Sequence, residues 1–368
     1  MNKRLSRKIW IHTILIMAFG LLSLYSAAFN NNRVSQQAFF DQLLFAGIAL
    51  ALMYVLGRSD YRKFYDVAYV LFALNIFLLL VVHLGGRHAL GARRWIEWGG
   101  LSFQPSELTK LSLILMLGRY FAHRRPSFSF DFFSTTSLIW WNLIYPFLLV
   151  LLPLLLVFKQ PDLGTAILLF GIFFIMLFIS GLEYKYFLAL LSFVLACLPL
   201  FWKLLKPYQK DRFLVFLNPN IDPLGAGYTI IQSKIAIGSG GLLGKGWLAG
   251  TQSQLNFLPE RHTDFIFSVI GEEWGLLGTL VLIYGYFMII QTGLTIAEQI
   301  KDNFGTLVSI GIVAIFLLQV FINIGMVLGL CPVVGITLPF VSYGRTSFLV
   351  FAVMMGFLLN LSKKRTIF

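Results

Sequence analysis

Apolar residues gather in this chain into long runs that are separated by shorter polar segments. Each run holds about 20 residues, which is enough for an α-helix to cross a hydrocarbon core of ~30 Å. The pattern predicts ten membrane-spanning helices at residues 10–29, 38–57, 64–84, 106–122, 138–158, 163–182, 186–204, 264–290, 306–330 and 346–361. We therefore expect an all-α polytopic membrane protein, with residues 1–368 forming a single integral membrane domain.

The loop charges predict the orientation of these helices. An even number of spans places both termini on one side, and both ends are basic, with Lys3 and Arg4 at the start and Lys363 at the end. The positive-inside rule makes this side cytoplasmic, and Arg58 and Arg62 in a short loop fall on the same side. Residues 205–263 then form a large extracytoplasmic loop.

Composition agrees with a lipid environment. Hydrophobic residues make up 58% of the chain, charged residues 12%, and the mean hydropathy is +0.80, whereas soluble domains carry about twice that charged fraction. The formal charge of +13 does not indicate nucleic acid, because Lys and Arg lie in loops instead of on one polar face. Membrane lipid is the expected partner. Cys197 and Cys331 lie far apart in apolar surroundings and indicate neither a disulfide nor a metal site.

One short loop has the wrong charge for its predicted side. Arg87, Arg93 and Arg94 follow the third span, although short outward loops are normally poor in Lys and Arg. The sequence leaves two explanations open, an anionic ligand at the outer face or stray surface charge.

Two segments of the long loop have a recognisable pattern. Residues 238–246 are Gly-rich, but Ser239 stands where a phosphate-binding loop needs Gly, and Gly246 where it needs Ser or Thr. Residues 227–237 are loosely amphipathic and are expected to form a helix that lies against the membrane surface. The long loop therefore gives no sign of nucleotide binding.

Ionisable residues inside apolar spans are costly and mark candidate sites. Glu107 and Lys110 stand three residues apart, so a helix places them on one face. They either neutralise each other, or line a polar cavity in which Lys110 meets a phosphate. Glu272 and Glu273 favour a packing role. Asp41 is a lone carboxylate in the second span and is assigned no role.

The densest group of reactive side chains ends the long loop. Glu260, Arg261, His262 and Asp264 precede or open the eighth span at its outer end. Asp264 either caps this helix or acts as a general base. Together with His262 it could also offer ligands to a divalent cation, which is a weak signal on its own. Asp162, before the sixth span, likewise has capping as its simplest role.

The predicted position limits the chemistry. A site on the outer face has no access to cytosolic ATP or nucleotide sugars, so an enzyme there needs an activated substrate that has already crossed, such as a polyprenyl-pyrophosphate glycoside. Its pyrophosphate requires cations, which Arg93, Arg94, Lys110 and Arg261 could supply. An aspartate near the acceptor hydroxyl could act as the base.

Five motifs, in this order, resemble the SEDS family. RodA-type elongation members are most similar, particularly over Lys245-Gly-Trp-Leu-Ala-Gly-Thr-Gln-Ser253. The resemblance runs from the first predicted span to the last. The motifs are Gly91-Ala-Arg-Arg-Trp95, Phe103-Gln-Pro-Ser-Glu-Leu-Thr-Lys110, Gln160-Pro-Asp-Leu-Gly-Thr165, the Gly-rich residues 231–250, and Leu258-Pro-Glu-Arg-His-Thr-Asp-Phe-Ile-Phe267.

The resemblance implies the ten-helix SEDS fold in a bacterial cytoplasmic membrane and polymerisation of lipid II into β-1,4-linked glycan strands during elongation of rod-shaped cells. It implies that the family's essential Asp is Asp264, and that its Glu and Lys are Glu107 and Lys110. It also implies a divalent cation, Mg²⁺ or Mn²⁺, a class B penicillin-binding transpeptidase and rod-complex membrane proteins as partners. The chain departs from the family at Arg345, where members usually have Gly.

We therefore interpret the chain as a membrane glycosyltransferase with Asp264 as its catalytic base. A lipid II flippase and a noncatalytic scaffold of the elongation complex are the alternatives. The predicted substrate-binding residues are Glu107, Lys110, Arg93, Arg94, Arg261 and Asp162, and the possible metal ligands are Asp264 and His262.

Overall fold

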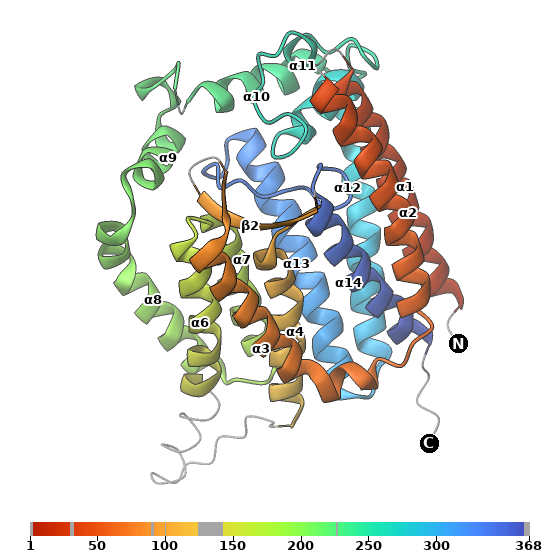
Figure 1. Ribbon diagram of the computed structural model, residues 1–368, viewed down its shortest axis with the longest axis vertical. Coiled ribbons are helices and arrows are strands. Elements are labelled where there is room, and N and C mark those ends of the chain that lie inside the picture. The colour runs from red at the N-terminus through yellow and green to blue at the C-terminus, as the bar shows by residue number, and fades with distance from the viewer. Residues whose placement is uncertain are drawn as a thin grey trace.

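The computed structural model describes residues 3–29, 33–89, 92–99, 101–123, 143–225 and 227–363. Gly91 and residues 138–142 of the fifth predicted span lie outside these ranges. The described residues form a bundle of long helices with shorter helices across one end, and the first and last described residues lie toward the other end (Figure 1). In chain order the elements are α1 (Lys3–Ala28), α2 (Arg33–Leu56), α3 (Arg62–Gly85), β1 (Arg87–Ala89), β2 (Ala92–Trp98), β3 (Leu101–Phe103), α4 (Pro105–His123), α6 (Tyr145–Lys159), α7 (Leu163–Ile179), α8 (Tyr184–Leu204), α9 (Pro207–Leu217), the 3-10 helix η2 (Pro219–Ile221), α10 (Tyr228–Gly240), α11 (Thr251–Gln254), α12 (Ile266–Gln299), α13 (Asn303–Leu328) and α14 (Arg345–Lys363).

Each predicted span overlaps one helix, the fifth span (138–158) over its described residues alone. In the described part of the chain seven helices are long and apolar enough to cross a membrane, namely α1, α2, α3, α8, α12, α13 and α14. The apolar helices α6 and α7 are shorter, and α4, which carries Glu107 and Lys110, has 19 residues. The chain is therefore a multi-pass membrane protein, as the apolar runs predict.

The helices α13 and α14 lie at the centre of the bundle. Of their most apolar windows 67% and 83% is buried, against none for the peripheral α8. Small residues allow the helices to approach closely. A Cβ at Gly311 would lie 2.7 Å from the side chain of Ile114 in α4, and one at Gly356 would lie 2.8 Å from Cβ of Leu56 in α2. The central helices therefore depend on glycine for their spacing.

A short sheet, which the all-α prediction did not include, connects α3 to α4. β1 pairs with β2 and β2 with β3, both antiparallel, with Arg87 opposite Trp95 and Ile96 opposite Phe103. β2 contacts α3 and α4, and β3 contacts α14. The sheet thus lies against α3, α4 and α14 (Figure 1).

A kink in α12 explains the Gly-rich stretch of the long loop. Gly275 has φ 62° and ψ −160°, which interrupts the helix. The carbonyls of Glu272 and Glu273 accept hydrogen bonds of 3.0 Å from the amides of Lys245 and Gly246 in place of intrahelical partners. The Nζ of Lys245 also donates to Oε1 of Glu272 at 2.7 Å. The Gly-rich turn therefore supplies the hydrogen-bond donors that the kinked helix lacks. The packing role predicted for Glu272 agrees with these contacts.

The amphipathic segment of the long loop forms α10, which crosses the end of the bundle (Figure 1). α10 packs against α12 and α13. The Oγ of Ser233 donates to the carbonyl of Val327 at 2.6 Å and lies 2.8 Å from Oγ of Ser268. The buried face of this helix is therefore held by protein, and contact of its other face with the membrane surface stays a prediction.

Candidate active site

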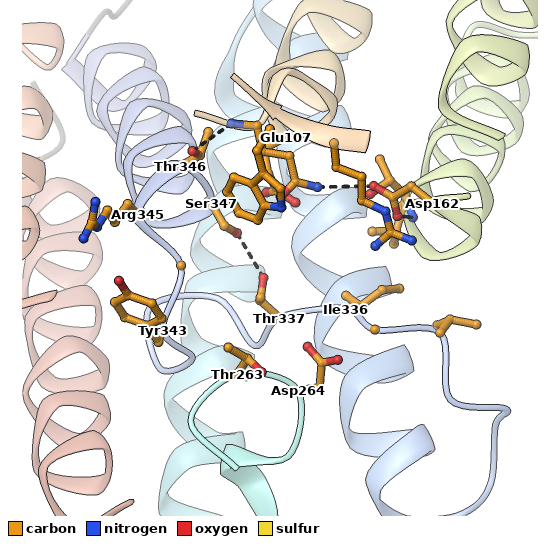
Figure 2. A pocket seen from close by; sticks show the side chains of 18 of the residues that line it. Glu107, Asp162, Thr263, Asp264, Ile336, Thr337, Tyr343, Arg345, Thr346 and Ser347 are labelled. Carbon is orange, nitrogen blue, oxygen red and sulfur yellow. Dashed lines mark hydrogen bonds between the residues drawn. The ribbon is translucent and has the colours of Figure 1, made fainter. Parts of the chain in front are cut away.

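A polar cavity of about 360 Å³ lies where the sheet, α4, α7, α9 and the segments before α12 and α14 meet. Figure 2 shows Glu107, Asp162 and Asp264 approaching it from three different elements. Its charged lining consists of Arg94, Glu107, Lys110, Asp162, Arg212, Glu260, Asp264 and Arg345. The fold thus brings Arg94, the pair Glu107 and Lys110, Asp162 and Asp264, which the sequence singled out in four separate segments, into one space.

Asp264 lies in the segment just before α12 and faces the cavity (Figure 2). The N-cap of α12 is Phe265, and no side chain caps the helix. Within the described residues nothing donates a hydrogen bond to the Asp264 carboxylate, while the Nδ2 of Asn323 fixes its backbone carbonyl at 3.0 Å. Capping therefore does not account for Asp264, and the carboxylate is available for chemistry.

A glycine keeps the space beside this carboxylate open. Gly335 has φ +72°, and a Cβ there would lie 3.3 Å from Oδ2 of Asp264. An L side chain at Gly335 would combine an unfavourable backbone conformation with a crowded carboxylate. The segment before α14 therefore passes close to Asp264, and the glycine leaves room for the carboxylate.

The electrostatic surroundings suit Asp264 to act as a base. Its pKa is raised to about 6, chiefly by burial and next by the Glu260 carboxylate, while the guanidinium groups of Arg212 and Arg94 oppose the rise and Asp162 adds to it. A carboxylate with this pKa is still mostly ionised at neutral pH, but accepts a proton more readily than an ordinary aspartate. Asp264 is therefore matched to general-base catalysis.

Of the two adjacent arginines in β2, Arg94 lines the cavity and Arg93 does not. Trp95, the next residue of the strand, also lines the cavity, whereas the Arg93 side chain is exposed. The Nε of Arg94 donates to the carbonyl of Gln160 at 3.2 Å, and its Nη2 donates to the carbonyl of Pro161. The substrate-binding role predicted for both residues is thus supported by position for Arg94 alone.

Arg212 of α9 is a cavity residue that the sequence did not single out. Its Nη1 donates to the carbonyl of Val333 at 3.1 Å, and its guanidinium lies 5.9 Å from the ring centre of Tyr208. Burial lowers its pKa, while Tyr208 and Asp264 oppose the change. Arg94 and Arg212 together give the cavity two guanidinium groups beside Asp264 and Asp162.

Glu107 and Lys110 form a buried pair at the end of the cavity opposite Asp264 (Figure 2). The Nζ of Lys110 donates to both carboxylate oxygens of Glu107 at 2.8 Å and to Oε1 of Gln319 at 2.9 Å. The Nε2 of Gln319 in turn donates to the carbonyl of Thr337 at 2.8 Å. Because an ammonium has three donors, a phosphate could bind Lys110 only by displacing one of these partners.

Asp162 combines capping with a place in the cavity. Its Oδ1 accepts from the amide of Thr165 at the start of α7 at 3.2 Å. Its Oδ2 accepts from Oγ of Ser106 at 3.1 Å and from Nε2 of Gln104 at 3.3 Å. The predicted capping role is confirmed. Asp162 also ties the starts of α4 and α7 together beside Arg94.

Arg261 and His262 lie outside the cavity lining, although they are neighbours of Asp264 in sequence. Arg261 is buried, and its Nε donates to the carbonyl of Ala27 at the end of α1 at 2.9 Å. The ring of His262 lies 6.2 Å from the ring of Tyr343, and burial lowers the pKa of this histidine. The turn directs the three side chains apart, so Arg261 anchors the loop to α1, and the substrate contact predicted for it stays a prediction.

The residues around the cavity can hold a divalent cation only with help from a substrate. In the part of the chain that the structure describes, no three His, Cys, Asp or Glu side chains are grouped as metal ligands. Asp264 presents one carboxylate to the cavity, and Mg²⁺ is commonly bound by one or two carboxylates together with substrate phosphates and water. Asp264 fits such a site, and His262 does not line it.

The sequence and the fold both match known proteins. The family model FtsW/RodA/SpoVE, described as a cell cycle protein, matches residues 6–367. The peptidoglycan glycosyltransferase MrdB of Escherichia coli K12 is 43% identical over 323 residues, which cover 86% of this chain and 84% of that protein. The peptidoglycan glycosyltransferase RodA of Treponema pallidum is 31% identical over 423 residues and covers 95% of each chain.

Two solved structures share the arrangement of helices. One, described as "Structural coordination of polymerization and crosslinking by a peptidoglycan synthase complex", aligns with a TM-score of 0.81 and 33% identity over 96% of both chains. The other is the rod shape determining protein RodA of Thermus thermophilus, with a TM-score of 0.71 and 29% identity over 98% of this chain and 97% of that chain.

Proposed function

The chain belongs to the FtsW/RodA/SpoVE family, and from this membership we propose that it is a peptidoglycan glycosyltransferase that polymerises lipid II into β-1,4-linked glycan strands during cell elongation. The observation that carries the proposal is the cavity itself. It places Asp264, which caps no helix, beside the guanidinium groups of Arg94 and Arg212. A base next to two cations is the arrangement that displacement of a pyrophosphate requires.

The reaction is a single displacement at the anomeric carbon of the donor sugar. Asp264 accepts the proton of the acceptor's 4-hydroxyl as its oxygen attacks that carbon. The bond to the pyrophosphate breaks, and the undecaprenyl pyrophosphate leaves with the bonding electrons. Attack from the opposite face inverts the anomeric centre and gives the β-1,4 link.

The arginines stabilise the charge of the departing group. Arg94 is fixed by two carbonyls and Arg212 by one, so both are already oriented when the negative charge develops, and oriented charges are the effective ones. Asp264 would help to hold a divalent cation, Mg²⁺ or Mn²⁺, which would supply further neutralisation of the departing pyrophosphate.

We also propose where the reaction takes place and with which partners. By the positive-inside rule the cavity faces outward from the bacterial cytoplasmic membrane, and both termini are cytoplasmic. A class B penicillin-binding transpeptidase would crosslink the strands as they form, and rod-complex membrane proteins would place both enzymes. The similarity to a chain of a peptidoglycan synthase complex supports the proposed transpeptidase partner.

Purified protein supplied with lipid II and a divalent cation in detergent tests the proposal. We expect the wild type to make long glycan strands, and Asp264→Asn to be at least ~100-fold slower, because removing a general base usually costs 10²–10⁴ in rate. Asp222→Asn is the matched control. It makes the same change in the loop that precedes Asp264, where Asp222 accepts a hydrogen bond from the amide of Gly225 at 3.0 Å and does not line the cavity.

Two results would contradict the proposal. Near-normal polymerisation by a folded Asp264→Asn protein would remove the base from the mechanism. Absence of strands from the wild type, together with protein-dependent movement of labelled lipid II across liposomes, would replace the polymerase by a flippase.

A further inference from the structure

Two charged residues have no part in the chemistry described above. Asp41 is a lone carboxylate within α2, and Arg345, the first residue of α14, is the position at which the chain departs from the SEDS pattern. The structure joins them, because the Nη2 of Arg345 donates to Oδ2 of Asp41. The two side chains are only 18% and 24% exposed, so the pair is largely shielded.

The Arg345 side chain is directed away from the reacting groups. Arg345 contributes to the cavity wall, but in Figure 2 its guanidinium points away from both Asp162 and Asp264. It reaches toward α2, where it also lies 5.9 Å from the ring centre of Phe45. This geometry favours a structural link between α2 and α14 over direct contact with a substrate.

The residues just before Arg345 connect this link to the segment that carries Asp264. The amide of Tyr343 donates to the carbonyl of His262 at 2.8 Å, and the Oγ of Ser342 donates to the carbonyl of Thr263 at 2.6 Å. These two bonds hold the two residues that precede Asp264. The position of the carboxylate therefore follows the position of the segment 342–345.

Three side-chain contacts fix that segment to α2. Gln42, next to Asp41, donates through Nε2 to the carbonyl of Ser342 at 3.2 Å and accepts from the amide of Gly344 at 3.4 Å. The phenol of Tyr343 takes part in side-chain hydrogen bonds with both Asp41 and Arg345. A continuous set of contacts thus runs from α2 through the 342–345 segment to residues 262 and 263.

We propose that the Asp41–Arg345 pair is a clamp that positions Asp264 for catalysis by holding the 342–345 segment against residues 262–263; this rests on the proposed role of Asp264 as the base. Asp264 needs such a clamp because, in the described residues, no donor holds its carboxylate directly. The orientation of the Asp264 carboxylate therefore depends on the position of its backbone. A displacement of about 1 Å at a reacting group can cost 10²-fold in rate.

The kinetic constants of Arg345→Gly test the clamp. We expect kcat for glycan polymerisation to fall about 10-fold while KM for lipid II stays within about twofold, because a displaced base slows the chemical step without removing a substrate contact. Asp41→Asn should give the same pattern. The reversed protein, Asp41→Arg with Arg345→Asp, should recover at least about half of the lost kcat, since it restores the pair.

Two further variants separate positioning from general loss of structure. Tyr343→Phe keeps the ring but removes the hydroxyl that joins Asp41 and Arg345 to the loop, and we expect a similar fall in kcat at an unchanged thermal midpoint. Arg58→Gly is the matched control. It removes an arginine just beyond the other end of α2, where Arg58 lies 4.1 Å from the ring centre of Tyr54, and it should leave kcat unchanged.

The outcomes are distinct. A rise in KM at unchanged kcat in Arg345→Gly would make Arg345 a substrate contact and overturn the clamp, as would wild-type kinetics of this variant. Failure of the reversed pair to recover activity, while Tyr343→Phe is fully active, would also overturn it. The proposed function is tested separately by the wild type and Asp264→Asn in the same assay, so a failed clamp and a failed polymerase give different results.

Discussion

Removing Lys110 should destabilise the protein far more than removing Glu107 and Lys110 together. Lys110 is 1% exposed and Glu107 7%, and the ammonium donates all three of its hydrogens to Glu107 and Gln319. Lys110→Met would leave a carboxylate buried with no counter-charge. Glu107→Gln would likewise leave a buried ammonium with no counter-charge.

The size of the effect follows from this burial. Removing one partner of a buried ion pair typically costs 3–5 kcal/mol, whereas replacing both partners by neutral groups of similar volume is often close to neutral. We expect Lys110→Met to lose about 3–5 kcal/mol in free energy of unfolding, and Glu107→Gln with Lys110→Met to lose at least about 2 kcal/mol less. The apparent thermal midpoint of the single variant should fall by roughly 5–10 °C.

The reversed pair, Glu107→Lys with Lys110→Glu, should be rescued only in part. Oε1 of Gln319 would then face a carboxylate in place of an ammonium. Turning the Gln319 amide would give up its bond of 2.8 Å to the carbonyl of Thr337. One hydrogen bond is worth about 1 kcal/mol net, so the reversed protein should stay below the wild type by at least that amount.

Thermal unfolding in detergent, followed by intrinsic fluorescence, measures these differences. A loss below about 1 kcal/mol for Lys110→Met, or a double variant no more stable than either single variant, would refute the argument from burial. Polymerisation by the reversed protein separates the two roles of Lys110. A folded, fully active reversed protein excludes phosphate binding by Lys110, and a folded inactive one favours it.

Two further predictions follow from the surroundings of Asp264. Its pKa is about 6 and the base must be ionised, so kcat/KM measured from pH 5 to 8 should be nearly constant above about pH 7 and fall with decreasing pH through about 6. Arg212→Ala should move this fall to higher pH, because Arg212 lowers the pKa of Asp264. A fall at an unchanged pH would contradict the assignment of Asp264 as the base. Gly335 has φ +72°, and the Cβ added by Gly335→Ala would lie 3.3 Å from Oδ2 of Asp264. This variant should lose about 1–2 kcal/mol of stability in thermal unfolding and most of its activity in strand synthesis. Gly47→Ala, whose Cβ meets no atom within 4 Å, should lose neither.

The spans were predictable because hydropathy is a local property of the sequence. The helix predicted at 106–122 forms at Pro105–His123, and the one at 346–361 forms at Arg345–Lys363. α12 extends to Gln299, nine residues beyond its predicted end. The prediction stopped too early because the last turns of this helix are polar and carry Glu298. A polar helix end beyond the apolar run gives no hydropathy signal, so the run alone sets too short a limit.

The sheet was missed because its longest strand carries no strand pattern. In β2 the polar residues Arg93, Arg94 and Glu97 do not alternate with the apolar ones, whereas a half-buried strand is recognised by a period of two. The segment is also short and lies in a chain dominated by helices. Arg94 lines the cavity together with its neighbour Trp95, and Arg93 does not, so strand alternation alone would not have separated the two arginines.

The place of Asp264 in a candidate site was predictable from the sequence, because four ionisable or polar residues directly precede it at the start of a span. Arg212 was not, because it is one of several basic residues in a long loop, and neither spacing nor neighbours distinguish it. Only the path of α9 brings its guanidinium to the cavity. Residues that reach a site from a long loop are set by tertiary structure, which a local pattern does not contain.

Asp41 and Arg345 mark the limit of sequence reasoning more sharply. A carboxylate within a membrane span must find a partner, because leaving a charge alone in that environment is costly. The sequence thus requires a partner for Asp41 without saying which one, and 304 positions separate the two residues in the chain. The packing of α2 against α14 makes the choice. Neither Asp41 in its span nor Arg345 in its motif is explained by its own sequence neighbourhood. Their contact explains both, and activity measurements can test its role.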